Sequence, residues 1–270
     1  MAEKKVVLVT GASSGIGLAT ALKLLKEGHV VYGGARRVAA MAPIEAGGGH
    51  VLSLDVGDEA SMTAAVETIL EEEGRIDVLV NNAGYPVYGA VEDVPIADAR
   101  RQFEVNLFGL ARMTQLVLPG MRERRSGTIV NISSMGAVIY TPLGAWYHAT
   151  KHAVEGFSDC LRLELAPFGI DVVIVAPGAI DTGFNGVLGE QVTKASGQGP
   201  YAGMAKAIAG TARPGRGSKP EVIADVIARA VAARRPKTRY RAGQFSHLLV
   251  YLRRALPDRW FDRLILSAAG

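Results

Sequence analysis

Three glycines near the start of the chain separate a strand-like stretch from a helix-like one, in the sequence TGASSGIG. Residues 5–10 are mostly apolar and β-branched, which predicts a buried strand, and the apolar residues after Gly17 repeat at helical spacing. A glycine-rich turn leaves the first N–H groups of the helix open, and these groups carry partial positive charge. Gly11, Gly15 and Gly17 therefore predict a binding site for a phosphate or another anion.

The spacing of these glycines differs from that of the two best-known phosphate-binding loops. A Walker loop ends in Gly-Lys-Ser or Gly-Lys-Thr, whereas Gly17 is followed by Leu18 and Ala19, which disfavours ATP chemistry. The usual dinucleotide fingerprint is Gly-x-Gly-x-x-Gly, and here the longer gap comes first. The glycines alone leave a purely structural turn open.

A phenol and an ammonium stand one helical turn apart in YHATK, as Tyr147 and Lys151. A free phenol, with a pKa of about 10, is a poor base at neutral pH. A neighbouring ammonium favours the phenolate and is expected to lower that pKa, which suits Tyr147 to proton transfer at an oxygen atom. Polar pairs at this spacing are also common on solvated helix faces, so the pair alone does not identify a site.

Alternating strands and helices are expected to position these groups. Apolar runs at 29–34, 50–56, 76–82, 127–133 and 170–176 predict five further strands, and stretches such as 59–74 and 220–235 have helical periodicity. This alternation predicts an α/β fold, a doubly wound parallel sheet of the Rossmann type forming a single domain over residues 1–270. Ligands of such sheets bind beyond the carboxyl ends of the strands. The residues at those ends are small, polar or charged: 11–17, Arg36, Arg37, Asp55, 81–84, Ser133, Ser134 and 177–182.

The composition of the chain argues against several other classes of protein. The 270 residues contain no long uncharged apolar run, and MAEKK leads directly into the first strand, so we expect a cytoplasmic protein. Cys160 is the single cysteine, which excludes an internal disulfide and a cysteine-based metal cluster. The net charge of +4 arises from residues 229–263, where ten Arg and Lys face only Asp258 and Asp262. Because no nucleic-acid motif accompanies these cations, we expect no nucleic-acid partner.

Together these residues resemble the short-chain dehydrogenase/reductase family, in its NADP-preferring single-domain branch. The glycine pattern resembles that family's form of the dinucleotide turn, NNAG at 81–84 its motif after the fourth strand, and YHATK its Tyr-x-x-x-Lys signature. The resemblance covers residues 5 to about 182. It implies hydride transfer between a nicotinamide cofactor and an alcohol or carbonyl compound, and a homodimer or homotetramer that pairs through long helices such as 102–125 and 147–166.

The resemblance also implies individual roles. Tyr147 is the acid or base, Lys151 tunes it, Ser134 binds the substrate oxygen, and Asn106 in FEVNLFG supports a proton-relaying water chain, with no metal required. Ser133 fits the family spacing less well than Ser134. The implied cofactor-binding residues are Gly11, Ser13, Ser14, Gly15, Ile16, Gly17, Arg36, Arg37, Asp55, Val56, Asn82, Ala83, Gly84, Tyr147, Lys151, Pro177, Gly178, Ile180 and Thr182.

The second strand predicts a preference for NADP over NAD. An NAD enzyme normally ends this strand with a carboxylate that binds the adenine ribose, and here the position is Ala35. Arg36 follows, where a guanidinium can hold a 2′-phosphate, with Arg37 and Ser13 as auxiliaries. A pair of solvated surface arginines is the alternative reading.

Several residues around this site carry weaker expectations. An apolar substrate, sterol-like or retinoid-like, follows if Tyr85, Tyr88, Val138, Ile139, Tyr140, Leu143 and Trp146 line the pocket. His148 is expected to face away from the site, and Asp181 to cap the segment after it. The glycine-rich segment 183–219 is expected to be a mobile loop or substrate lid.

Two questions stay open in the sequence. The basic C-terminal segment 244–266 places Phe245, Leu248, Leu249, Leu252 and Leu256 on one helical stripe. That stripe fits either an anionic membrane surface or packing on its own domain. The activity also has rivals: a catalytically silent protein that senses NADP and binds partners, and an epimerase or dehydratase, which the short chain disfavours.

Overall fold

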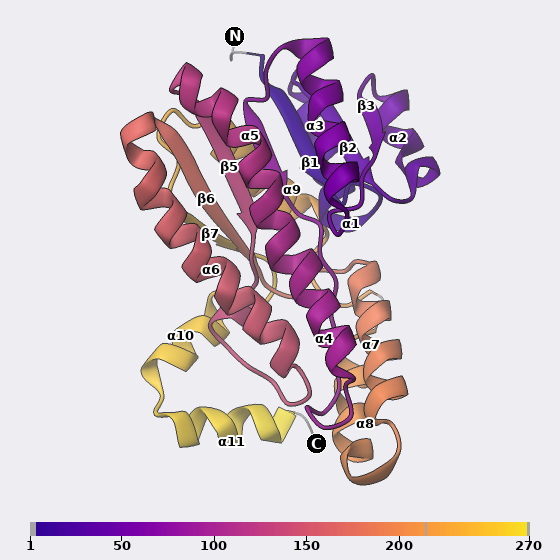
Figure 1. Cartoon of the computed structure of the whole chain (residues 1–270). Coiled ribbons are helices and arrows are strands. Elements are labelled where there is room, and N and C mark those ends of the chain that lie inside the picture. The colour runs from indigo at the N-terminus through magenta and orange to yellow at the C-terminus, as the bar shows by residue number, and fades with distance from the viewer. Residues whose placement is uncertain (1–3, 214, 269–270) are drawn as a thin grey trace.

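The computed structural model describes residues 4–213 and 215–268, so Pro214 of the segment 183–219 lies outside the described residues. Its centre is a seven-stranded parallel sheet with the order β3-β2-β1-β4-β5-β6-β7 (Figure 1). The central strand β1 pairs with β2 and β4, so that Val9 lies opposite Gly33 and Val80. The strands are β1 (Val6–Thr10), β2 (Val30–Ala35), β3 (His50–Ser53), β4 (Val78–Asn81), β5 (Gly127–Ile132), β6 (Ile170–Pro177) and β7 (Arg239–Ala242).

Helices cover both faces of this sheet, which confirms the predicted doubly wound α/β fold (Figure 1). Within the described residues the helices are α1 (Gly15–Lys26), α2 (Ala42–Ala46), α3 (Glu59–Glu73), α4 (Ile96–Phe103), α5 (Leu110–Arg124), α6 (Ala145–Leu165), α7 (Gly183–Ser196), α8 (Ala202–Thr211), α9 (Glu221–Ala232), α10 (Leu248–Ala255) and α11 (Asp258–Ala268). None of these helices combines the length and apolar character needed to span a bilayer.

The alternation of side chains along the strands creates two cores. Val7 and Val9 face one side, where they pack with α1 and α9, and Val6 and Leu8 face the other, where they pack with α3, α5 and α6. Because successive strand side chains point to opposite faces, a strand buried on both sides must be apolar throughout. This requirement explains why the buried strands β1, β2, β4, β5 and β6 could be predicted from apolar runs.

Two elements differ from the sequence-based expectation. The seventh strand, β7, has the sequence RYRA and was not predicted, because a half-buried edge strand does not need an apolar run. The segment 183–219 contains helices α7 and α8, so the expectation of a loop was wrong. Its glycines do not prevent helix formation, because apolar residues such as Phe184, Leu188 and Val192 pack α7 onto the rest of the domain.

The C-terminal segment 244–266 contains two helices, α10 and α11, separated at Leu256–Pro257, and the predicted stripe lies at and around α10. Leu249, Leu252 and Leu256 pack inward, whereas Leu248 and Phe245 are exposed. Figure 1 shows both helices, in yellow, below the sheet together with α7 and α8.

Candidate active site

The glycine turn between β1 and α1 is held tight by backbone contacts. Gly11 and Gly15 adopt positive φ angles of 67° and 55°, which L side chains rarely adopt. A Cβ atom at Gly17 would lie 2.4 Å from the Gly11 carbonyl oxygen, so only glycine fits there. The Asn82 amide donates to the carbonyls of Thr10 and Gly11, at 2.9 and 3.2 Å. The NNAG motif thus supports the turn, and the turn leaves the N-terminus of α1 open to a phosphate.

Arg37, more than Arg36, contacts this turn. Its guanidinium donates to the hydroxyls of Ser13 and Ser14, at 3.3 and 3.4 Å. Arg36 lines the same cavity, and its charge acts on the phenol of Tyr85. The sequence had given Arg36 the main role and Arg37 the auxiliary one. The structure brings both to the end of β2, beside Ala35, and gives Arg37 the direct contact with the turn.

One cavity of about 1880 Å³ connects nearly all of the predicted site residues. Ser134 lines it together with every predicted cofactor-binding residue except Gly17, which lies behind the turn. Asn106 is not part of the wall. The cavity is large enough for a dinucleotide and a substrate side by side, because drug-sized ligands occupy roughly 300–1,000 Å³.

Tyr147, Ser134 and Lys151 meet at the carboxyl end of β5. Lys151 is 8% exposed; its ammonium lies 5.9 Å from the centre of the Tyr147 ring and donates to the Ile132 carbonyl at 2.9 Å. Burial raises the pKa of Tyr147 to about 12, and a hydrogen bond from Ser134 acts in the opposite direction. Burial lowers the pKa of Lys151 to about 8.

The expectation that Lys151 lowers the pKa of Tyr147 is therefore wrong for the protein without a bound cofactor, because the pKa of Tyr147 is raised. Desolvation disfavours the charged form of both side chains, and it outweighs the opposing hydrogen bond of Ser134 to Tyr147 and the opposing charge of Glu155 near Lys151. At neutral pH the phenol of Tyr147 is protonated.

Asn106 lies outside the cavity wall and connects two segments that border the cavity. It lies in a π-helical stretch, Glu104–Gly109, between α4 and α5, and such stretches often mark functional sites. Its amide accepts from the Tyr85 N–H at 3.1 Å and donates to the Tyr85 carbonyl at 3.1 Å and to the Thr150 hydroxyl at 3.3 Å. Asn106 thus ties α6, through Thr150 between Tyr147 and Lys151, to the loop after β4.

His148 does not face away from the site, as its sequence position had suggested. Its ring lines the cavity, where Nδ1 bonds the Gly136 carbonyl at 2.7 Å and Nε2 accepts from the Thr141 N–H at 3.1 Å. Burial lowers the pKa of His148, which keeps the ring neutral with its proton on Nδ1. His148 therefore holds both ends of segment 136–141, which follows Ser134.

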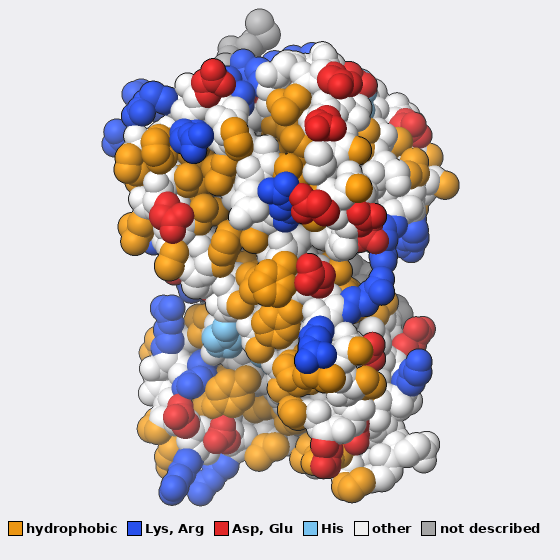
Figure 2. Space-filling model, in the orientation of Figure 1, with side chains coloured by type: hydrophobic (Ala, Val, Ile, Leu, Met, Phe, Trp, Pro, Cys, Tyr) orange, Lys and Arg blue, Asp and Glu red, His pale blue; other side chains and the backbone are white. Residues whose placement is uncertain are grey.

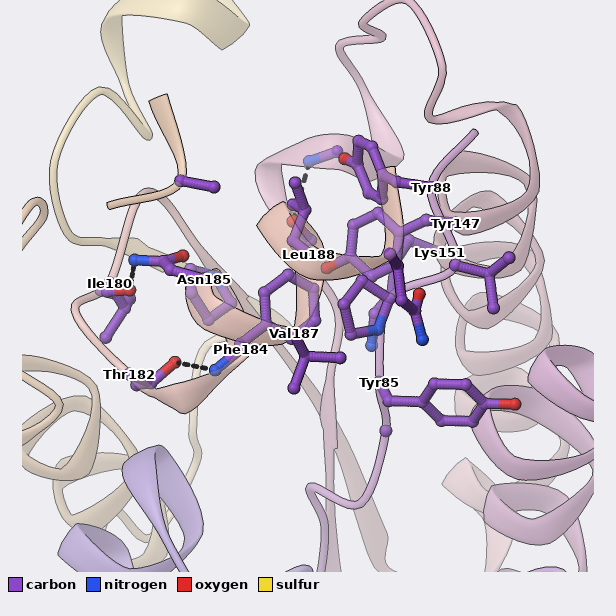
Figure 3. Close-up of a pocket in the computed structure, with 18 of the residues that line it drawn as sticks. Tyr85, Tyr88, Tyr147, Lys151, Ile180, Thr182, Phe184, Asn185, Val187 and Leu188 are labelled. Carbon is purple, nitrogen blue, oxygen red and sulfur yellow. Dashed lines mark hydrogen bonds between the residues drawn. The ribbon is translucent and has the colours of Figure 1, made fainter. Parts of the chain in front are cut away.

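The substrate end of the cavity is apolar. Tyr88 lies with its ring centre 5.8 Å from that of Tyr147, and Phe184 of α7 packs against Tyr147 at 5.3 Å (Figure 3). Helix α7 was not predicted, although the apolar spacing in GFNGVLGEQV contained the signal. The cavity-lining side chains that it contributes include Phe184, Val187 and Leu188.

Only some of the residues that were predicted to line the substrate pocket do so. Tyr88 and Ile139 line the cavity, and Leu143 packs in the cluster behind it. Tyr85 also borders the cavity but points away from Tyr147 (Figure 3). Residues outside the wall are Val138, Tyr140 and Trp146.

The cap of α7 is Thr182, not Asp181 as expected. The Thr182 hydroxyl accepts from the Phe184 N–H at 3.3 Å, whereas the Asp181 carboxylate accepts from the Gly215 N–H at 2.9 Å. Asp181 thus fixes the far end of the segment that contains α7 and α8.

Comparison with known proteins gives consistent matches. The family model described as short chain dehydrogenase matches residues 5–193. A 3-ketodihydrosphingosine reductase of Bacteroides thetaiotaomicron is 38% identical over 263 residues, covering 95% of this chain and 94% of that protein. A solved short-chain dehydrogenase from Streptomyces avermitilis has a TM-score of 0.80 and 35% identity, covering 98% of this chain and 95% of the other. A variant of the actinorhodin polyketide ketoreductase, solved with NADPH, has a TM-score of 0.76 and 33% identity, covering 90% and 97%.

Proposed function

This chain belongs to the short-chain dehydrogenase family and is an oxidoreductase, and we propose that it transfers hydride between NADP(H) and a hydrophobic secondary alcohol, ketone or aldehyde. The observation that carries the proposal is the meeting of Tyr147, Ser134 and Lys151 in one cavity that also contains the glycine turn and the arginines after β2. A silent cofactor sensor would not need these reactive groups together, which disfavours that rival.

The residues of the cavity fit a bound NADP. The open N-terminus of α1 suits the pyrophosphate, and Arg37 with Ser13 offers donors to a 2′-phosphate. Asn82 and Thr182 lie along the same wall. When bound, the nicotinamide would supply or accept the hydride.

The side chains of the protein would handle the proton. Ser134 would hold the substrate oxygen, and Tyr147 would donate a proton to that oxygen as the carbonyl is reduced. Because the Tyr147 pKa is about 12, the phenol carries its proton at neutral pH, which suits it to the reductive direction. Lys151, whose pKa is about 8, keeps positive charge beside the phenol at neutral pH and stabilises the phenolate left after proton transfer.

The substrate class follows from the wall of the cavity. Tyr88, Phe184, Val187 and Leu188 present apolar surface beside the Tyr147 phenol. Apolar walls bind hydrocarbon, and the related protein from Bacteroides is named a 3-ketodihydrosphingosine reductase. We therefore expect long-chain or polycyclic ketones to be better substrates than sugars.

The test is a panel of hydrophobic and polar carbonyl compounds, followed by the absorbance of NADPH or NADH. Replacing Tyr147 with phenylalanine should lower kcat about 10²- to 10⁴-fold and leave NADPH binding nearly intact. Tyr140→Phe is a matched control, because the Tyr140 hydroxyl bonds Asp262 outside the cavity. Turnover of Tyr147→Phe within threefold of the parent would reject the acid role.

A further inference from the structure

Exposed apolar side chains are concentrated at the C-terminus. Six of the 15 large exposed hydrophobic residues found among the described residues fall within 245–266, although this stretch is a small part of the chain. The most exposed are Tyr251 at 69% and Trp260 at 62%. We call this set the C-terminal patch: Phe245, Leu248, Tyr251, Trp260, Leu264 and Leu266.

Arginines surround the C-terminal patch. Arg254, Arg259 and Arg263 are exposed, and the guanidinium of Arg263 lies 5.6 Å from the Trp260 ring centre. Figure 2 shows hydrophobic and basic side chains interspersed at the lower left, where Figure 1 places α10 and α11. Two acidic residues lie among these arginines. Asp258 pairs with Arg253 at 2.9 Å, and Asp262 accepts from the Tyr140 hydroxyl at 2.8 Å. The patch therefore combines apolar surface with net positive charge.

The C-terminal patch continues into the active-site cavity. Phe245 and Leu264 belong to the patch and also line that cavity. Phe245 is half exposed and has a φ of 64°, a strained conformation for a residue other than glycine. The inner faces of α10 and α11 hold Val250 and Phe261 against Ile139, in the segment after Ser134. A molecule that approaches the patch is thus at the mouth of the site.

We propose that the C-terminal patch docks on an anionic lipid surface and that lipid-like substrates enter the cavity from there. Tryptophan, tyrosine and leucine insert into the interfacial region of a bilayer, and each arginine near an anionic surface contributes about 1 kcal/mol. Only the substrate part of this inference depends on the proposed function. A second copy fits the patch less well, since a twofold interface would bring two copies of the same net positive surface together.

Vesicle flotation of the whole protein tests the docking, and it requires no cofactor or turnover. We expect the protein to float with vesicles of phosphatidylcholine and phosphatidylserine at low salt, weakly with phosphatidylcholine alone, and to be released at high salt. Tryptophan emission should shift to shorter wavelength on binding, and this shift should be absent in Trp260→Gln, which leaves Trp146 in place.

Charge reversal provides the matched comparison. Arg259→Glu with Arg263→Glu, two residues outside the cavity wall, should lower vesicle partitioning at least about tenfold. Arg122→Glu, on exposed α5, should not. Absence of flotation with phosphatidylserine at low salt would overturn the proposal, even if the enzyme reduces ketones. So would a parent that does not bind vesicles but loses an oligomeric state, measured by light scattering, in the double variant.

Discussion

At the level of single residues, burial decides the charge states of Tyr147 and Lys151. The two groups lie close together, yet desolvation disfavours both the phenolate and the ammonium. The result is a phenol that holds its proton and an ammonium whose pKa lies near the working range of an enzyme. A neutral proton donor is what carbonyl reduction requires.

The buried Lys151 should destabilise the folded protein in a pH-dependent way. Its pKa is lowered from 10.5 to about 8, so the cost, about 3 kcal/mol, is full below pH 8 and disappears as the pH rises past 10.5. Lys151→Met removes this cost and also the bond to Ile132. Relative to the parent, the stability of the variant should fall by about 2 kcal/mol between about pH 7 and 9.5, measured by urea unfolding. An unchanged difference would contradict the lowered pKa.

The arginines after β2 should set the cofactor preference. Losing a charge-assisted contact of about 1.5 to 3 kcal/mol should weaken NADP binding about ten- to a hundredfold and affect NAD much less. Arg37→Ala should have the larger effect, because Arg37 contacts Ser13 and Ser14, and Arg36→Ala the smaller. The measurement is the ratio of kcat/KM for NADPH and NADH in each variant. A parent that prefers NADH, or a ratio that neither variant changes, would contradict this interpretation.

At the level of elements, His148 couples helix α6 to the segment that follows Ser134. Because the ring bonds both Gly136 and Thr141, His148→Ala should let that segment move and lower kcat about 10- to 100-fold, with little change in NADPH affinity. His152→Ala is the control on the same helix, since the His152 ring bonds the carbonyl of His148 within α6. If His148→Ala is folded by circular dichroism and keeps parental kcat, the positioning role fails, and rescue of kcat in His148→Asn would support it.

Helices α7 and α8 cover the cavity with few buried side chains of their own. In α7 these are Val192 and Ser196, near its C-terminal end, where Ser196 bonds Asp93. We therefore expect α7 to open from its N-terminal half and act as the lid. Hydrogen exchange at 183–190 should slow when cofactor and substrate are both bound, and exchange near Ser196 should change less. Strong protection throughout α7 in the free protein would contradict a lid.

At the level of the whole molecule, the outer face of α5 and α6 remains unpaired within the described chain. Phe108, at the start of this layer, is 54% exposed and Leu163 of α6 is 71% exposed. We expect a homodimer or homotetramer to cover this face. Leu163→Glu should reduce the mass measured by light scattering, whereas Leu22→Glu, an exposed leucine of α1, should not. A parent that is already monomeric would refute the expectation.

The amino-acid sequence by itself determined six of the seven strands of the sheet and the candidate reactive groups. A strand buried on both faces needs an apolar run, and a tight turn needs glycine, so β1, β2, β4, β5, β6 and the turn at Gly11 could be recognised locally. The edge strand β7 could not, because a half-exposed strand tolerates its arginines. Helix α7 was missed for another reason: its glycines resemble a loop, although Phe184, Leu188 and Val192 repeat at helical spacing.

Only the tertiary structure decided the electrostatics and orientations of the site. The direction of the shift in the Tyr147 pKa depends on how far distant segments bury the phenol away from water. The spacing of residues along the sequence does not give this burial. The orientation of His148 depends on where segment 136–141 passes α6, and the contact of Arg37 with Ser13 depends on how β2 meets the glycine turn. Spacing along a chain fixes which groups can be neighbours on one element, whereas solvation and hydrogen bonding depend on all the elements that pack around them.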